Sequence, residues 1–152
     1  MNKVYEVINN DYLISTDIKK ISVQIVYDYL STESYWAKDI SFSTVQKSIS
    51  NSMCFGLFYK NMQIGFARVV TDKATFAYLA DVFIIAEHQN KGLGKWLIKT
   101  IHTHPDLQDL RRWMLVTKDA HNLYTQFGWS SITEEQYRRI MQKHNTDVYK
   151  KQ

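Results

Sequence analysis

The alternation of apolar and polar positions at the start of the chain predicts a short hairpin followed by two helices. Two brief apolar runs flank Asn9–Asp11, whose residues tolerate a tight turn, so residues 4–14 predict two strands. Apolar positions then recur at helical spacing from Asp17, a residue type that caps helices, to about Leu30. A shorter helix is predicted over residues 43–50, after a polar loop.

The middle of the chain is its most apolar part and predicts three strands in series. These strands span Met53–Tyr59, Gln63–Val70 and Thr75–Ile85, with short polar turns between them. Consecutive strands joined by short turns usually pair with each other. We therefore expect an antiparallel meander.

The following part of the chain alternates helices with one strand. Apolar positions at helical spacing after Gly92 predict a helix that Pro105 ends. Residues 111–117 predict a further strand. A last clear helix follows, with Asp119 expected as its cap and Gly128 as its end.

The tail after Ser130 fits two interpretations. Residues 133–144 have helical propensity, whereas residues 147–151 are compatible with a closing strand.

No internal repeat, low-complexity segment or linker divides the chain, so we expect one domain over residues 1–152. Hairpins followed by alternating strands and helices indicate a mixed α+β fold.

Composition narrows the class of protein. A content of 45% apolar and 14% aromatic residues indicates a globular chain. The net charge of +4 favours anionic ligands, but the basic residues do not cluster as in a dedicated nucleic-acid-binding protein. Cys54 is the single cysteine, which excludes an intrachain disulfide and a multi-cysteine zinc site. With no signal-like start and no run of about 18 apolar residues, we expect a cytoplasmic protein without a membrane or nucleic-acid partner.

A glycine-containing loop lies between the predicted strand ending at Ile85 and the next helix. Its sequence is Gln-Asn-Lys-Gly-Leu-Gly, residues 89–94. Unpaired N–H groups at a helix start attract anions, and glycine lets the backbone approach a phosphate closely. The neighbouring Lys91 and Lys95 add positive potential. The loop therefore predicts a diphosphate site, although glycines also serve simply to form tight turns.

Two familiar phosphate-binding motifs do not fit this loop. A Walker loop requires a hydroxyl residue at the position of Trp96 and a glycine at the position of Gln89. A dinucleotide fingerprint requires a third glycine where Leu97 stands, and it follows a parallel strand rather than a meander. These residues exclude the Walker loop and leave only a weak match to the dinucleotide fingerprint.

The loop, the preceding "LADVFII" and the downstream "DAHNLYTQFGW" together resemble the GNAT superfamily of N-acetyltransferases. The acetyl-CoA loop of that family reads (Arg/Gln)-x-x-Gly-x-(Gly/Ala), and the resemblance is strongest over residues 53–129. It implies an α+β fold with a central, mostly antiparallel twisted sheet. About six or seven strands, flanked by about four helices, are expected, with the sheet splayed at the cofactor site.

The resemblance also implies an activity. The chain would move an acetyl group from acetyl-CoA to the primary amine of an unidentified small molecule or peptide, directly in a ternary complex and without a metal. The diphosphate would lie on the loop amides, and the pantetheine arm would pair with the preceding strand. The implied cofactor-binding residues are Val82, Phe83, Ile84, Gln89, Asn90, Lys91, Gly92, Leu93, Gly94 and Lys95.

Two side chains are candidates for the proton transfers. Tyr124 matches the family tyrosine implied as general acid, because a phenol with a pKa near 10 stays protonated at neutral pH. Asp81 precedes the pantetheine-pairing segment and is the candidate base, with a substrate-binding or salt-bridged aspartate as the alternative. His121 and Asp119 are possible supporting residues. Thr117 stands where the family often has an asparagine.

A sheet that binds RNA is the rival interpretation, because residues 64–70 ("IGFARVV") are similar to an RNP strand. Arg68, however, occupies a position where that motif has an aromatic residue.

The acceptor pocket would be built from the first helix, the loop at residues 34–41 and the tail. Tyr35, Trp36 and Phe42 either line this pocket or simply pack. The oligomeric state is open, with a homodimer as one option.

Overall fold

The computed structural model describes residues 3–150, and a six-stranded sheet lies at its centre. The strand order follows the chain, and all neighbours are antiparallel except the last two, which are parallel. The strands are β1 (Glu6–Asn9), β2 (Tyr12–Ser15), β3 (Met53–Tyr59), β4 (Met62–Thr71), β5 (Phe76–Ile84) and β6 (Arg112–Met114). The hairpin, the meander and the further strand predicted after them are thereby confirmed, and the parallel pairing of that strand is a finding of the structure.

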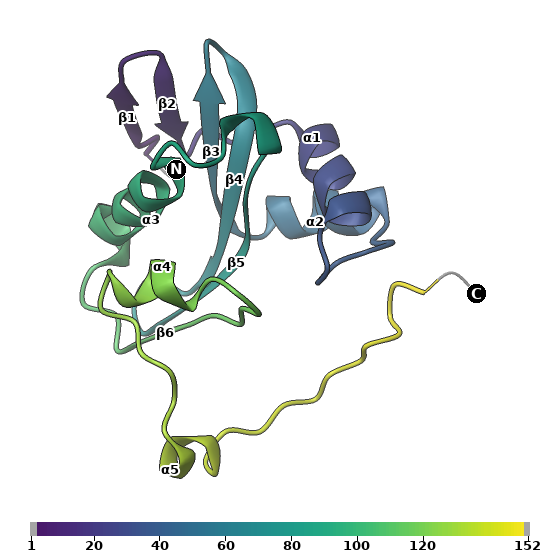
Figure 1. The fold of residues 1–152 in the computed structure, drawn as a ribbon, viewed down its shortest axis with the longest axis vertical. Coiled ribbons are helices and arrows are strands. Elements are labelled where there is room, and N and C mark those ends of the chain that lie inside the picture. Colours follow the sequence, from purple (N-terminus) through teal and green to yellow (C-terminus); the bar gives the residue numbers. More distant parts are fainter. Residues whose placement is uncertain (1–2, 151–152) are drawn as a thin grey trace.

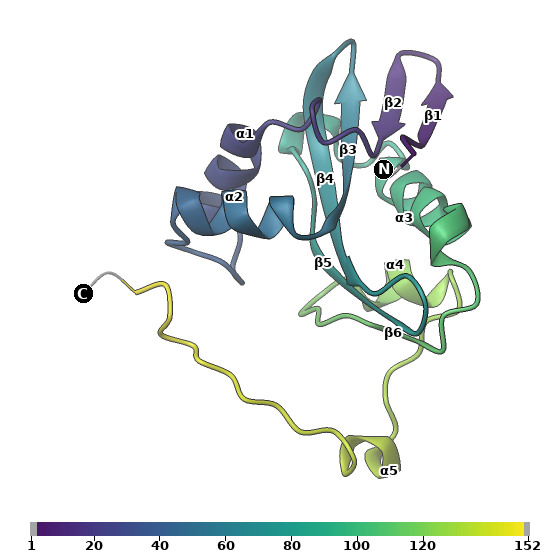
Figure 2. The same cartoon turned by 180° about the vertical axis from the view of Figure 1, so that it is seen from behind.

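Helices cover both faces of this sheet (Figure 1). One face carries α1 (Val23–Asp28) and α2 (Phe42–Ser50), and the other carries α3 (Leu93–Thr103) and α4 (His121–Thr125), as the reverse view also shows (Figure 2). Shorter elements are the π-helix η1 (Tyr29–Glu33), the 3-10 helices η2 (Ala86–His88) and η3 (Pro105–Leu107), and α5 (Glu134–Tyr137). The α+β class predicted from the sequence is confirmed.

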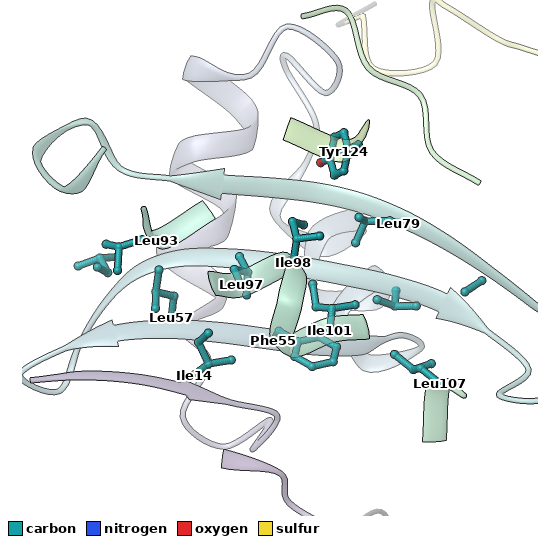
Figure 3. Close-up of a cluster of buried hydrophobic side chains, with 14 residues drawn as sticks. Ile14, Phe55, Leu57, Leu79, Leu93, Leu97, Ile98, Ile101, Leu107 and Tyr124 are labelled. Carbon is teal, nitrogen blue, oxygen red and sulfur yellow. The ribbon is translucent and has the colours of Figure 1, made fainter. Parts of the chain in front are cut away.

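Two hydrophobic clusters hold the helices against the sheet. The cluster under α3 and α4 includes Phe55, Leu97 and Ile98, each fully buried (Figure 3). The cluster under α1 and α2 contains Phe66, whose neighbour in β4, Ala67, belongs to the first cluster. Successive side chains of a strand point to opposite faces, so β4 contributes to both clusters. Each large side chain buried in this way contributes about 1.5–3 kcal/mol.

The first helix begins later than the sequence pattern predicted. The backbone makes a turn after Asp17, whose carboxylate accepts a local backbone hydrogen bond. Ser22 caps α1 instead, because its Oγ accepts a hydrogen bond from the Ile25 N–H at 3.2 Å. The N–H of Ser22 donates to Gln63 Oε1 of β4 at 2.7 Å. Contacts between side chains and backbone, rather than the apolar spacing, therefore set where this helix begins.

The start of α4 also differs from the prediction. Asp119 does not cap the helix, and the N-cap position is taken by Ala120. The Ala120 N–H, which precedes the first turn of the helix, donates to Thr117 Oγ1 at 3.1 Å. The prediction of an Asp119 cap is wrong, because the helix begins one residue later than predicted and no side chain within residues 3–150 caps its first turn.

Gly128 ends α4 as predicted. Its φ angle is +84°, a left-handed conformation that suits glycine. The Gly128 N–H donates to the Thr125 carbonyl at 3.4 Å, and the Trp129 N–H donates to the Tyr124 carbonyl at 3.3 Å. These two bonds form a Schellman motif, which satisfies carbonyls at the helix end.

The tail does not complete the sheet. The short helix α5 has a capping box formed by Thr133 and Gln136, and both views show it and the following chain apart from the sheet. Residues 147–150 form turns rather than a closing strand, and Lys151 lies outside the described residues. Met141 is 95% exposed. Of the two interpretations of the tail, the helical one holds only for α5, and the closing strand is wrong.

Close contact between β4 and β5 predicts that Gly65 tolerates no larger residue. A Cβ at this position would lie 2.9 Å from the Phe83 carbonyl oxygen and 3.2 Å from Leu57. We expect Gly65→Ala to lower the free energy of unfolding by about 1–3 kcal/mol, measured by urea denaturation. Gly94→Ala is the control, because its nearest neighbour would be 3.8 Å away and alanine favours helices. Equal stability of the two variants would contradict this packing argument.

Candidate active site

The sheet opens between β5 and β6. These strands pair only through Phe76–Tyr78 and Arg112–Met114, whereas β5 continues to Ile84. After Met114 the chain turns toward α4, so the edge of β5 from Leu79 onward has no partner in β6. We call this opening the splay. Its free strand edge agrees with the splayed sheet that the family resemblance implied.

The glycine loop leads from the end of β5 into α3. Gly92 is the N-cap of α3 with φ +76°, and Asn90 also has a positive φ of +62°. No side chain among residues 3–150 caps this helix, so the N–H groups of its first turn are available to an anion. The Gln89 amide donates to the Ile84 carbonyl at 2.8 Å and fastens the loop to β5.

Gly94 places the start of α3 against two other parts of the site. A Cβ at Gly94 would lie 3.8 Å from Ile84 of β5 and 3.9 Å from Leu123 of α4. The loop, the free end of β5 and α4 therefore converge at one place. A Cβ at Gly92 would meet no atom within 4 Å, so the outer side of the loop is open.

Tyr124 lies on α4 (Figure 3) and follows Leu123, the α4 residue that Gly94 approaches. The sequence pattern placed it at the edge of the core, but its exposed fraction is only 8%, and it belongs to the main hydrophobic cluster. Its hydroxyl has no hydrogen-bond partner among residues 3–150, and it is not among the atoms sealed from solvent. Burial, and to a smaller extent the charge of Tyr35, raises the pKa of Tyr124 to about 12.

Asp81 lies at a bulge where the pairing of β4 and β5 shifts register. Its φ is +54°, and both of its carboxylate oxygens accept hydrogen bonds. Oδ1 accepts from Trp36 Nε1 at 2.9 Å, and Oδ2 accepts from Arg68 Nε at 2.7 Å. Arg68 also donates to Ser52 Oγ at 3.2 Å. The interpretation of Asp81 as a salt-bridged strand residue therefore describes its geometry, and a role as base stays a prediction.

Three residues near the splay were not singled out as site residues from the sequence. Arg68 argues against an RNP strand, but as a charged residue inside an apolar strand it also indicates a functional or ion-paired position. Tyr29 stacks on Phe83 with 4.0 Å between ring centroids, and burial followed by the charges of Glu33 and Asp119 raises its pKa. Burial, then the charge of Asp81, raises the pKa of Tyr78.

The other residues predicted from the sequence differ in whether they contact Tyr124, Asp81 or the splay. His121 and Asp119 are exposed, and neither makes a hydrogen bond to Tyr124 within residues 3–150. Phe42 packs edge-on against Tyr27 at 5.5 Å between ring centroids, away from Asp81. Tyr35 and Trp36 are therefore the members of the predicted acceptor-side group that reach the splay.

Other candidate sites find little support. Phe66, the central aromatic residue of the RNP-like strand, is 0% exposed, so it cannot stack on a base, and the RNA interpretation is wrong. Within residues 3–150, no three His, Cys, Asp or Glu residues gather as a metal site would require. The helices of the described chain are all too short or too polar to cross a bilayer.

Comparisons with known proteins agree with this geometry. A family model described as an acetyltransferase (GNAT) domain matches residues 50–131. A Gibberella zeae protein named as an acetyltransferase is 33% identical over 75% of this chain and 76% of its own length.

Solved structures give the same result. A Xanthomonas campestris pv. campestris protein described as a GNAT-family acetyltransferase is 39% identical, with a TM-score of 0.86 over 99% of each chain. An Elizabethkingia anophelis GNAT acetyltransferase with acetyl-CoA bound shares the fold, with a TM-score of 0.59 and 15% identity over 78% of this chain and 76% of its own. Together with the splay, the glycine loop and Tyr124, these likenesses show that the chain is an acyltransferase enzyme belonging to the GNAT acetyltransferase family.

Proposed function

We propose that this enzyme moves the acetyl group of acetyl-CoA to the primary amine of a small molecule or peptide, directly in a ternary complex. The observation that carries the proposal is the open glycine loop at the start of α3, which joins the free edge of β5 and the helix of Tyr124. The acetyl-CoA bound to the Elizabethkingia anophelis relative supports the same donor here. When bound, acetyl-CoA supplies an activated acyl group on a thioester.

The backbone of the loop would hold the donor's diphosphate. The N–H groups of Leu93, Gly94 and Lys95 belong to the uncapped first turn of α3, and the helix dipole adds positive potential there. Asn90, Lys91 and Gly92 extend this surface, and Gln89 holds the loop on β5. The unpaired edge at Val82, Phe83 and Ile84 would form hydrogen bonds with the pantetheine arm, as a neighbouring strand does.

A backbone N–H of β5 near the bulge at Asp81 would stabilise the negative charge that develops on the thioester oxygen. Fixed amides in a partly buried site need little reorganisation during the reaction. The amine nitrogen forms a bond to the carbonyl carbon, the carbon–sulfur bond breaks, and the sulfur leaves as a thiolate. The amine proton must therefore be taken up, and the thiolate must be stabilised.

Tyr124 would donate a hydrogen bond to the departing sulfur. Its raised pKa of about 12 keeps the phenol protonated at every physiological pH. A thiol has an ordinary pKa near 8.5, so complete proton transfer from so weak an acid is uphill. We therefore propose that Tyr124 stabilises the thiolate by hydrogen bonding during bond cleavage, and that solvent then supplies the proton that converts the thiolate to a thiol.

Asp81 would take the amine proton through a water molecule. Both of its oxygens already accept hydrogen bonds, from Trp36 and Arg68, so a bridging water is the simpler route.

A route through an acetyl-cysteine is disfavoured, because burial raises the pKa of Cys54 to about 12 and keeps the thiol protonated. We further propose that residues 1–152 act as one domain in the cytoplasm, which is compatible with a chain whose single cysteine excludes an intrachain disulfide.

The loop geometry predicts the effect of removing one glycine. Gly92→Ala should weaken acetyl-CoA binding about 10-fold, because an L-residue with positive φ is strained by about 1–2 kcal/mol and the loop would relax away from its shape. Gly128→Ala is the matched control, since its φ of +84° and open surroundings give the same strain outside the loop. Calorimetric titration with acetyl-CoA measures both. If the two variants bound acetyl-CoA with equal affinity, the loop would not be the donor-binding site. If the unaltered enzyme did not bind acetyl-CoA at all, the proposed function would be refuted.

The role of Tyr124 predicts a change in turnover without a change in donor affinity. Tyr124→Phe should lower kcat by about 10-fold to 1000-fold, because one transition-state hydrogen bond is lost while the ring still packs. The release of free thiol from acetyl-CoA is followed with a panel of primary amines, amino acids, aminoglycosides and peptides. Unchanged kcat in the variant would show that Tyr124 does not act on the sulfur.

The buried phenol also predicts a stability change at high pH. Its pKa is raised from 10.0 to about 12, so between these values the unfolded chain releases a proton that the folded chain keeps. The contribution of Tyr124 to stability is thus fully present below pH 10 and is lost as the pH rises toward 12. We expect the free energy of unfolding to fall by roughly 2 kcal/mol more in the unaltered enzyme than in Tyr124→Phe over this range. If urea denaturation showed the same change in the free energy of unfolding with pH for the unaltered enzyme and for Tyr124→Phe, the raised pKa would not belong to Tyr124.

A further inference from the structure

Two neighbouring aromatic residues on the acceptor side are exposed and yet held in place. Tyr35 is 54% exposed and Trp36 is 40% exposed, and their rings pack edge to face with 5.0 Å between centroids. They belong to residues 34–39, which connect η1 to the turn before α2 and which we call the strap. Ser34 and Ala37 of the strap are buried and anchor it, with the Ala37 N–H donating to Ser34 Oγ at 3.0 Å.

The strap crosses the splay. On one side, Trp36 Nε1 donates to Asp81 on β5 at 2.9 Å. On the other side, the Tyr35 hydroxyl accepts a hydrogen bond from the N–H of Lys118, between β6 and α4, at 2.8 Å. The last pair that β5 and β6 form is Tyr78 with Met114, so both contacts lie beyond the point where the strands separate. The strap therefore bridges the two sides of the opening.

The strap also lies next to the chemistry. The Tyr35 hydroxyl is held at Lys118, two residues before the N-cap of α4, the helix that carries Tyr124. Trp36 and Arg68 meet Asp81 on the sheet face that carries α1 and α2, opposite the cluster that contains Tyr124. An acceptor that approached a donor bound in the splay from this face would meet the two exposed rings.

The polar groups around the strap are already paired with one another. Asp81 accepts from Trp36 and Arg68, Arg68 also donates to Ser52, and the Tyr35 hydroxyl accepts from the Lys118 N–H. What the strap offers to an incoming molecule is therefore mainly ring surface. Exposed aromatic rings fixed by hydrogen bonds bind a ligand with little loss of conformational entropy.

We propose that Tyr35 and Trp36 contact the acceptor and select a primary amine carried on an aromatic body. This inference rests on the proposed function and adds the class of acceptor to it. An aromatic body gains contact area against the two rings, and its ammonium form is attracted to the face of the Trp36 ring before it loses a proton, since Lys118 Nζ already lies 5.7 Å from the centroid of the Tyr35 ring. A polyhydroxylated amine such as glucosamine must give up water around several hydroxyls without finding enough free partners in return.

Thiol release with tyramine and glucosamine tests the class of acceptor, with acetyl-CoA at saturation. We expect kcat/KM for tyramine to exceed that for glucosamine by at least about 10-fold, a typical discrimination for one well-contacted apolar group. Trp36→Ala should raise the KM for tyramine about 10-fold while the affinity for acetyl-CoA is kept. Trp36→Phe should largely restore the KM, because it keeps a ring and loses only the indole N–H.

Phe42→Ala is the matched control. Phe42 has the same exposed fraction as Trp36, 40%, but it packs on Tyr27 rather than on Asp81. It should leave the KM for tyramine unchanged. Preference for glucosamine, or a Trp36→Ala variant with unaltered KM for tyramine, would overturn the inference while the acetyltransferase function stands. Binding of acetyl-CoA without turnover of tyramine would also overturn it, whereas failure to bind acetyl-CoA at all would refute the proposed function itself.

Discussion

The site depends on the early separation of β5 from β6. On one edge β5 pairs with β4 along nearly its whole length, while on the other its contact with β6 ends at Tyr78. Backbone donors and acceptors beyond that residue lie at an edge that a ligand can complete, within a strand that the rest of the sheet keeps rigid. The glycine loop, α4 and the strap all lie around this one edge, so the same separation that interrupts the sheet creates the place where the chemistry can occur.

The burial of Tyr124 connects stability with the proposed reaction. A phenol at the surface would be a stronger acid and would find water as a partner, but it would be less fixed in position. Here the ring belongs to the main cluster, and the hydroxyl remains without a protein partner among the described residues. Packing thus holds the ring while the oxygen is left free to bind a ligand, which is the arrangement expected of a preorganised hydrogen-bond donor.

Much of the fold could be predicted from the sequence because its signals are local. The meander, α3 after Gly92 and the end of α4 at Gly128 follow from apolar spacing and from backbone conformations that favour glycine. The acceptor side could not be predicted in this way. Trp36 meets Asp81 across 45 positions, and Tyr35 meets Lys118 across 83, and neither contact leaves a periodic pattern. The tail was ambiguous for another reason, since helical propensity alone does not sustain a helix without a surface to pack on.

The bulge at Asp81 has a consequence for how this segment tolerates insertions and deletions. Ala77 and Leu79 before the bulge, and Val82 and Ile84 after it, all contact the cluster under α3, while Phe83 faces the other way and stacks on Tyr29. The extra residue resets the alternation of the strand. Deleting Asp81 would leave Leu79 and Val82 two positions apart, so regular alternation would keep Val82 and Ile84 toward α3 and Phe83 toward Tyr29. The deletion would instead remove the bulge and the carboxylate that Trp36 and Arg68 contact. The faces of β5 therefore tolerate this shortening, whereas the site does not.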